Sequence, residues 1–288
     1  MKTYFECFPC FFRQALEIGR LLNLDDVRQK EFIDAVAALI PQFSLDSTPP
    51  EMARRIYQVI TNRYGAMDPY ADIKVRSNRM ALELYPDMEK IIAAADDRLL
   101  TALEIAIAGN IIDYGVKNNL DIERAIEQLL EEGFVKADRR VFDYEHFQND
   151  LRSAEKILYI GDNAGEIVFD KLLVSELLAL EKKVIFGVRG QPIINDAVME
   201  DARACGLDQM VPVVSSGLDA PGTILPLCSA EFRDIFKRSD LIISKGQGNF
   251  ETLSDEPANI YFLFKAKCPV VADKVGAHLG DIVLKRCR

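Results

Sequence analysis

The chain has 288 residues, of which 49% are hydrophobic and 28% are charged, and this is the composition of a folded globular protein rather than a disordered one. Its 45 acidic residues outnumber 35 basic ones and give a net charge of −10, which argues against a protein that wraps a nucleic-acid polymer or binds an anionic membrane. The six cysteines do not follow a secreted disulfide pattern, and we identify no export signal and no membrane span, so we expect a cytoplasmic location.

Residues 1–150 are predicted to form a helical domain. Prolines and glycines lie where helices are expected to end, among them Pro41, Gly65 and Pro86. Apolar residues recur at spacings of three and four in six segments, namely residues 11–24, 25–40, 50–65, 72–84, 88–108 and 122–131.

Residues 151–288 show a different pattern, in which short apolar runs alternate with helical windows. Such alternation predicts a parallel sheet that is covered by helices on both faces, and hence an α/β domain. The predicted strands are residues 156–160, 183–188, 210–214, 241–244 and 269–272. The predicted helices are residues 166–180, 194–205, 229–237 and 256–267.

Ligands of such sheets bind beyond the carboxyl ends of the strands, so the loops after the predicted strands are where we expect a site. Asp162 and Asn163 follow the first strand, and Asp196 lies in the loop after the second. Their carboxylate and amide oxygens are the donors that Mg²⁺ and Mn²⁺ prefer. Each residue also has a simpler interpretation as a turn residue or a helix cap.

The same loops are rich in glycine, which lets main-chain amides approach an anion closely. Lys245 and Lys274 are predicted to neutralise phosphoryl oxygens there. A cation, lysines and main-chain amides together predict phosphoryl transfer or hydrolysis of a phosphate ester.

Two other functions are considered. A dinucleotide-dependent oxidoreductase would need a glycine fingerprint that the segment KGQGNFE lacks, and this segment is not a Walker A loop either. A sensor that binds a metal or a phosphorylated metabolite without turnover would keep the same loops, and it remains the alternative.

Seven segments in a fixed order resemble the metal-dependent damage-control phosphatases, in particular their microbial subfamily with an amino-terminal Cys-x-x-Cys. The resemblance covers essentially the whole chain and implies a helical domain beside a three-layer α/β/α domain. It also implies hydrolysis of small phosphorylated metabolites, either sugar phosphates or damaged purine nucleotides and their precursors. The segments are CFPC (7–10), DPYADIKVRSN (68–78), AGNIIDYG (108–115), GDNAGE (161–166), RGQPIINDA (189–197), SSGLDAPG (215–222) and SKGQGNFE (244–251).

The resemblance also implies roles for single residues. Asp162, Asn163 and Asp196 match the metal ligands of the family, which works with Mn²⁺, Co²⁺ or Ni²⁺ rather than Mg²⁺. Another branch of the family has an Arg-Thr-x-Lys motif near its carboxyl end. The nearest match in this chain, residues 271–274, keeps only the lysine, Lys274. The segment that matches the phosphate-contacting loop comprises Lys245, Gly246, Gln247, Gly248 and Asn249, and we add Arg189 and Ser215 as further candidates for phosphate contact.

For the chemistry, we expect Asp162 and Lys245 to be the catalytic residues. Either an activated water attacks phosphorus, with Asp196 or Glu166 as the base, or Asp162 attacks first to give an aspartyl-phosphate. We favour water slightly, because a carboxylate that already binds a metal is a poorer nucleophile.

Two pairs of residues in the first half of the chain are further candidates for functional residues. Asn110 and Asp113 lie three residues apart on one helix face and are predicted to contact substrate hydroxyls, unless Asn110 only ends its helix. Cys7 and Cys10 start a helix, where they form either a redox or metal pair or two buried small side chains. The sequence does not indicate an oligomeric state.

Overall fold

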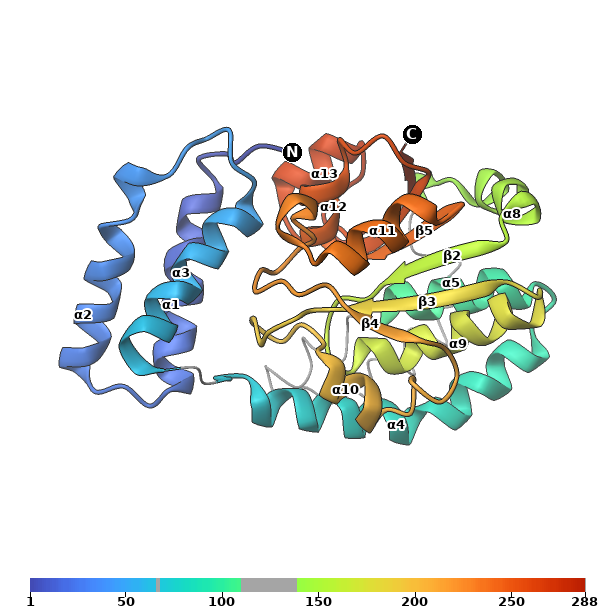
Figure 1. Ribbon diagram of the computed structural model, residues 1–288, viewed down its shortest axis with the longest axis horizontal. Coiled ribbons are helices and arrows are strands. Elements are labelled where there is room, and N and C mark those ends of the chain that lie inside the picture. Colours follow the sequence, from blue (N-terminus) through green and yellow to red (C-terminus); the bar gives the residue numbers. More distant parts are fainter. Residues whose placement is uncertain (66–67, 110–138, 288) are drawn as a thin grey trace.

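The computed structural model describes residues 1–65, 68–109 and 139–287 of the chain (Figure 1). The helix predicted over residues 122–131 and the candidate residues Asn110 and Asp113 lie outside these described residues. In the described ranges, none of the helices combines the length and the apolar character that a membrane crossing requires.

Three helices form a layer at one end of the molecule, on the left in Figure 1. They are α1 (Cys7–Leu21), α2 (Asp26–Ala37) and α3 (Pro49–Tyr64), and a short 3-10 helix (Ile40–Gln42) precedes α3. The start of α3 follows from its sequence, because Thr48 and Glu51 form a capping box and Pro49 occupies the first turn. Phe32 of α2 and Ile56 of α3 are fully buried in the core that these helices share.

Two further helices, α4 (Ala71–Ala94) and α5 (Arg98–Ala108), pack on α9 (Glu166–Ala179) and with it cover one face of the sheet. We expected Pro86 to end a helix, but it lies inside α4. Pro86 and Leu82 are both exposed, so water can satisfy the Leu82 carbonyl group that the proline leaves without a helical partner. The helix predicted over residues 88–108 is divided just before α5, which Asp97 caps.

The sheet has seven strands in the order β1-β7-β6-β5-β2-β3-β4. All neighbouring strands are parallel except β6 and β7, which confirms the predicted α/β class with a mostly parallel sheet. The strands are β1 (Val141–Phe142), β2 (Lys156–Ile160), β3 (Lys183–Val188), β4 (Val213–Ser215), β5 (Leu241–Lys245), β6 (Ile260–Lys265) and β7 (Ile282–Cys287).

Apolar cores on both faces of the sheet give the molecule three layers. Successive residues of β2 alternate between them, since Tyr159 lies in the core shared with α4, α5 and α9 and Leu158 lies in the core on the other face. The second face is covered by α11 (Ala230–Arg238), α12 (Gln247–Leu253) and α13 (Pro269–Val275). The other helices in the described part of the chain are α8 (Tyr144–Ser153), α10 (Met199–Ala204) and the 3-10 helix Leu225–Leu227.

Two predictions near the carboxyl end are wrong. The window 256–267, predicted as a helix, contains strand β6, and the window 269–272, predicted as a strand, starts helix α13. The run Ile-Tyr-Phe-Leu-Phe of β6 is buried throughout and is rich in the aromatic residues that strands favour. Pro269 fits the first turn of a helix, where its missing N–H is not needed. Strand β7, which pairs antiparallel with β6, was not predicted.

Elements from both sides of the predicted boundary at residue 150 contribute to the same sheet and to the helices that cover it. That boundary falls inside α8, and β1 already pairs with β7 before it. Helices α4 and α5 also belong to a layer of the sheet. The division into a unit of residues 1–150 and a unit of residues 151–288 stays a prediction.

Candidate functional site

The loops that follow β2 and β3 meet at the carboxyl edge of the sheet. Asn163 and Asp196 form an antiparallel main-chain bridge, and the N–H of Ala197 donates a 2.7 Å hydrogen bond to the carbonyl oxygen of Asp162. The side chains of Asn163 and Asp196 are buried, and that of Asp162 is nearly so. The structure therefore brings together Asp162, Asn163 and Asp196, which we predicted as ligands from two separate loops.

Arg189, at the end of β3, lies between the two acidic side chains. Its Nε donates to Asp196 Oδ2 at 2.6 Å, its Nη1 donates to Thr223 Oγ1 at 3.1 Å, and its Nη2 lies 3.7 Å from Asp162 Oδ1. Nη2 is buried and has no hydrogen-bond partner among the residues that the structure describes. The predicted contact of Arg189 with a phosphate oxygen stays a prediction, and this donor is the atom that would make it.

The surroundings of Asp162 are more negative than its neighbouring cations can offset. Burial raises the pKa of this carboxyl group well above its ordinary value, Asp196 and Glu166 raise it further, and Arg189 and Lys267 counteract the shift. A divalent cation would relieve this excess of charge. Two carboxylates and an amide oxygen are hard donors of the kind that Mn²⁺ and Mg²⁺ accept, so the residues fit such an ion. In the described ranges no three His, Cys, Asp or Glu side chains gather as ligands, so the set needs the Asn163 amide.

The position after β5 requires a glycine, Gly246, because its backbone lies against the side chain of Asp162. The residue has a φ of +81°, and a Cβ built on it would lie 2.1 Å from Asp162 Oδ2. The loop that matches the family's phosphate-contacting segment thus lies directly against the carboxylate of Asp162.

Lys245 has a different role from the one we expected. Its Nζ is fully buried and donates to the carbonyl oxygen of Ala106 at 2.8 Å, to Glu166 Oε1 at 2.7 Å and to Asp170 Oδ1 at 2.5 Å. An ammonium group has three donors, and all three are engaged here. Lys245 is therefore not arranged to contact phosphate, and this expectation is corrected.

Asn249 and Gln247 also use their side chains within the protein. Asn249 is fully buried, donates to the carbonyl oxygen of Lys245 at 2.8 Å and accepts from Thr223 Oγ1 at 2.8 Å. Gln247 donates to Glu251 Oε1 at 2.9 Å and accepts from the N–H of Lys267 at 3.2 Å. The N–H of Gly246 donates to the carbonyl oxygen of Leu263 at 3.0 Å, so the phosphate contact that we predicted for Gly246, Gln247, Gly248 and Asn249 would have to come from the main-chain N–H groups of the last three.

Lys274 is not brought to this edge of the sheet. It is exposed in the last turn of α13, near Cys287. Burial raises the pKa of the Cys287 thiol, and Lys285 and, more weakly, Lys274 counteract the shift. Cys287 pairs with Ile260 at the amino end of β6, which is the edge opposite to Asp162. The predicted phosphate contact of Lys274 is therefore corrected.

Ser215 and Glu166 complete the list of expected side chains. Ser215 ends β4 and its Oγ accepts from the N–H of Gly217 at 3.1 Å, so its predicted role is not tested further. Glu166 uses one carboxylate oxygen for Lys245 and the other for Asn163 Nδ2. A residue with both oxygens engaged in this way is a poor base, which leaves Asp196 as the candidate from our pair.

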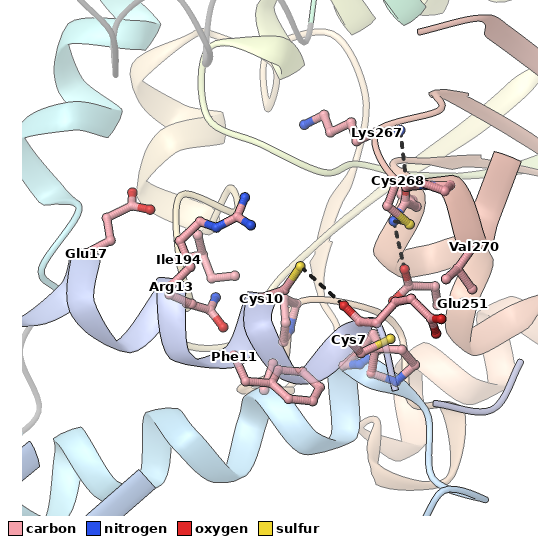
Figure 2. A pocket seen from close by; sticks show the side chains of 18 of the residues that line it. Cys7, Cys10, Phe11, Arg13, Glu17, Ile194, Glu251, Lys267, Cys268 and Val270 are labelled. Carbon is pink, nitrogen blue, oxygen red and sulfur yellow. Dashed lines mark hydrogen bonds between the residues drawn. The ribbon is translucent and has the colours of Figure 1, made fainter. Parts of the chain in front are cut away.

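A pocket of about 590 Å³ adjoins these loops (Figure 2). One wall comes from α1, with Cys10, Arg13 and Glu17, and Figure 2 shows Lys267 extending over the pocket from the other side. Lys267 is a residue that sequence reasoning missed, because the window 256–267 was assigned to a helix. The buried aromatic run directly before it was the signal that would have placed it in a loop at the end of a strand.

The cysteine pair lines the same pocket. Cys7 and Cys10 lie one turn apart on α1, and Cys268 faces them across the pocket. Burial is the largest cause that raises the pKa values of the Cys7 and Cys268 thiols, and it disfavours the thiolate form that redox chemistry and metal binding require. All six cysteines are free thiols. The suggested redox or metal role of Cys7 and Cys10 stays a prediction.

Helix α4 holds the site loops in place through Asn78. Its Oδ1 accepts from the N–H of Gly165 at 2.6 Å, and its Nδ2 donates to Asp201 Oδ1 at 2.9 Å. Lys74 pairs with Asp201 at 2.9 Å and with Asp68 at 3.2 Å. The segment 68–78 thus anchors the starts of α9 and α10, and this function explains its polar residues.

Comparisons with known proteins find similarity over nearly the whole chain. A model of the damage-control phosphatase ARMT1-like domain matches residues 3–283. The chain is 34% identical over 292 residues to damage-control phosphatase PH1575 of Pyrococcus horikoshii, covering 99% of this chain and 98% of the relative. It is 33% identical to a damage-control phosphatase of Archaeoglobus fulgidus, covering 99% of each. The crystal structure of a DUF89 family protein from Pyrococcus horikoshii superposes with a TM-score of 0.89 at 31% identity, covering 100% of both chains.

We predict that Gly246→Ala destabilises the protein more than Gly276→Ala does. Both glycines have a φ of +81°, but nothing lies within 4 Å of a Cβ at Gly276. The control should lose about 1 to 2 kcal/mol from its left-handed backbone alone. Gly246→Ala should lose at least about 1 kcal/mol more, because it displaces a buried carboxylate. Urea unfolding measures both, and equal losses would contradict the close contact with Asp162.

A second prediction concerns Glu251, which lies in the pocket wall. Burial raises the pKa of this carboxyl group from 4.5 to about 7, and Gln247 and the amino-terminal ammonium counteract the shift. Since the folded state holds the proton more tightly, this group stabilises the protein below pH 4.5, and the contribution is lost as the pH rises to about 7. The change amounts to at most about 3 kcal/mol. Glu251→Gln should therefore be more stable than the wild type at pH 8 and similar at pH 4.5 in urea unfolding, and parallel pH profiles would refute this.

Proposed function

Because the chain belongs to the family of damage-control phosphatases with an ARMT1-like domain, we propose that it hydrolyses phosphate monoesters of small metabolites with the help of a divalent cation. The observation that carries the proposal is the meeting of Asp162, Asn163 and Asp196 at the carboxyl edge of the sheet, where Ile194, from the loop of Asp196, lines a pocket that Lys267 also lines. Sugar phosphates and damaged purine nucleotides or their precursors are the substrate classes that we propose. The pocket volume of about 590 Å³ suits molecules of this size.

Asp162, Asn163 and Asp196 would hold the cation, which as Mn²⁺, Ni²⁺, Co²⁺ or Mg²⁺ would polarise the phosphoryl group and lower the pKa of a water molecule. The protein itself supplies positive charge from two sides. Arg189 offers the buried Nη2, and Lys267 places its ammonium close enough to influence Asp162. Both are suited to neutralise phosphoryl oxygens as negative charge develops in the transition state.

We propose water rather than Asp162 as the nucleophile. Asp162 Oδ2 accepts from Asn163 Nδ2 at 3.1 Å, and Oδ1 faces Arg189 Nη2. One oxygen of Asp162 thus accepts a hydrogen bond and the other lies beside a positive charge, and binding of a cation would weaken this carboxylate further as a nucleophile. Asp196 lies next to it and is the proposed base.

The central test measures phosphate release by the full chain after removal of metal and reloading with Mn²⁺, Ni²⁺, Co²⁺ or Mg²⁺. p-Nitrophenyl phosphate and a panel of phosphorylated metabolites serve as substrates. We expect release that depends on the metal and falls by about 100-fold or more in Asp162→Asn, since a loss of several kcal/mol of charge stabilisation has this effect.

Asp219→Asn is the matched control, because Asp219 lies in another loop at the same edge of the sheet but pairs with Arg54. Its activity should stay within about twofold of the wild type. If the wild type binds Mn²⁺ and a phosphate ester but releases no phosphate with any metal, the sensor alternative replaces the phosphatase.

The lysine assignment gives a separate prediction. Lys267→Met should lower kcat/KM for a phosphate monoester by about 10- to 100-fold, because it removes a positive charge from the pocket. Lys274→Met should change it by less than about twofold, since this exposed lysine lies at the opposite edge of the sheet. A larger loss for Lys274→Met than for Lys267→Met would restore our original expectation from the sequence.

A further inference from the structure

A chain of buried polar contacts leads from the sheet interior to Asn163. Tyr159 donates its hydroxyl hydrogen to Asp170 Oδ1 at 2.7 Å, and Lys245 bonds both Asp170 and Glu166. The other oxygen of Glu166 accepts from Asn163 Nδ2 at 3.1 Å. Each of these five side chains is at most 5% exposed, so solvent does not compete for their hydrogen bonds.

These contacts determine which end of the Asn163 side chain faces the ligand. Nδ2 donates to Glu166 Oε2 and also to Asp162 Oδ2, both at 3.1 Å. Both partners are carboxylate oxygens, which accept but do not donate, so only the NH₂ end of the amide can occupy this position. The carbonyl end, Oδ1, is the end that remains for a cation.

We infer that Glu166, held by Lys245, is a positioning residue that fixes the Asn163 amide with its oxygen toward the cation. Without Glu166 only Asp162 Oδ2 would hold the NH₂ group, so the amide would rotate more easily and turn that group, which a cation repels, toward the ion. This inference rests on the proposed function, because it names a residue that prepares one ligand of the proposed cation. It also gives a role to Lys245, whose three donors are all engaged by acceptors of the protein.

The position of Glu166 follows from its place on α9. Glu166 and Asp170 lie four residues apart and therefore on the same face of the helix, where Lys245 Nζ reaches both. The ammonium also bonds the carbonyl oxygen of Ala106 in α5, so three elements hold it in place. A side chain held in this way can orient its neighbour at little entropic cost on ligand binding.

The test is a double-mutant cycle on Mn²⁺ affinity, measured by calorimetry on the full chain without substrate. Glu166→Gln should weaken Mn²⁺ binding by about 10- to 100-fold, as substitutions behind a metal ligand do. Asn163→Ala should weaken it at least as much. If Glu166 acts through Asn163, the double variant should bind no more weakly than Asn163→Ala alone, whereas multiplicative losses would overturn the inference.

Glu104→Gln is the matched control, because Glu104 is another buried carboxylate that pairs with an arginine, Arg139, outside this chain of contacts. Like Glu166→Gln, this variant replaces a buried glutamate by glutamine, and it should bind Mn²⁺ as tightly as the wild type does. Thermal melting of every variant separates loss of fold from loss of affinity. An equal loss of affinity in Glu104→Gln would show a general effect of buried charge and overturn the inference.

A second readout does not need the metal. In the metal-free protein, the side-chain amide protons of Asn163, identified in ¹H–¹⁵N spectra by their absence in Asn163→Ala, should exchange slowly with water. Glu166→Gln and, where it folds, Lys245→Met should speed this exchange by at least about tenfold, while Glu104→Gln should not. An unchanged exchange rate in Glu166→Gln would overturn the inference. If the wild type binds no divalent cation, the proposed function fails, and this readout alone decides the positioning role.

Discussion

The structure depends on how four acidic side chains are accommodated at one buried edge of the sheet. Two positively charged side chains pair with them. Arg189 faces Asp196 and Asp162, and Lys245 bonds Glu166 and Asp170. At Asp162 the balance is least favourable to the ionised form, because burial, Asp196 and Glu166 raise the pKa of its carboxyl group more than Arg189 and Lys267 lower it. An arrangement that costs stability in this way is typical of sites that bind a cation.

The topology of the sheet determines which loops can share this edge. Strand β2 lies between β3 and β5, so the loops after all three converge around Asp162. Since the strands are parallel, each loop leads into a helix that returns along the sheet, and the first residues of α9 carry Glu166 toward Lys245. Main-chain pairing between the loops after β2 and β3 then holds Asn163 and Asp196 together more rigidly than side-chain contacts alone would.

Much of this could be predicted from local patterns, and the failures share a physical cause. The residues of β2 and β3 are short apolar runs with clear boundaries, and their loops carry the Asp and Asn residues that we expected to meet. Near the carboxyl end the periodicity of a short apolar run does not separate a helix from a strand, and the aromatic residues of β6 were the signal that favoured the strand. The helix assigned to residues 256–267 hid Lys267, and the strand assigned to residues 269–272 made Lys274 look like the residue at the end of a strand.

Lys245 shows a different limit of sequence reasoning. A lysine beside glycines at the end of a strand is the pattern of a phosphate contact, and the residue does lie next to that loop. Its direction is set by Glu166, Asp170 and Ala106, which are distant in sequence, and no local pattern reveals that they converge on it. Identity and position are thus readable from the chain, whereas the direction of a long side chain depends on tertiary contacts.

Two parts of the fold line the pocket, the loops at the edge of the sheet and helix α1. Ile194, Pro221 and Gln247 line the pocket from the edge of the sheet, whereas the facing wall comes from α1, which belongs to the layer of helices at the end of the molecule. Exchanges at Arg13, Gln14 or Glu17 would therefore alter the α1 wall of the pocket and leave the loops that carry Asp162 and Asp196 unchanged. Such a separation lets one reaction centre acquire new preferences through the evolution of a single helix face.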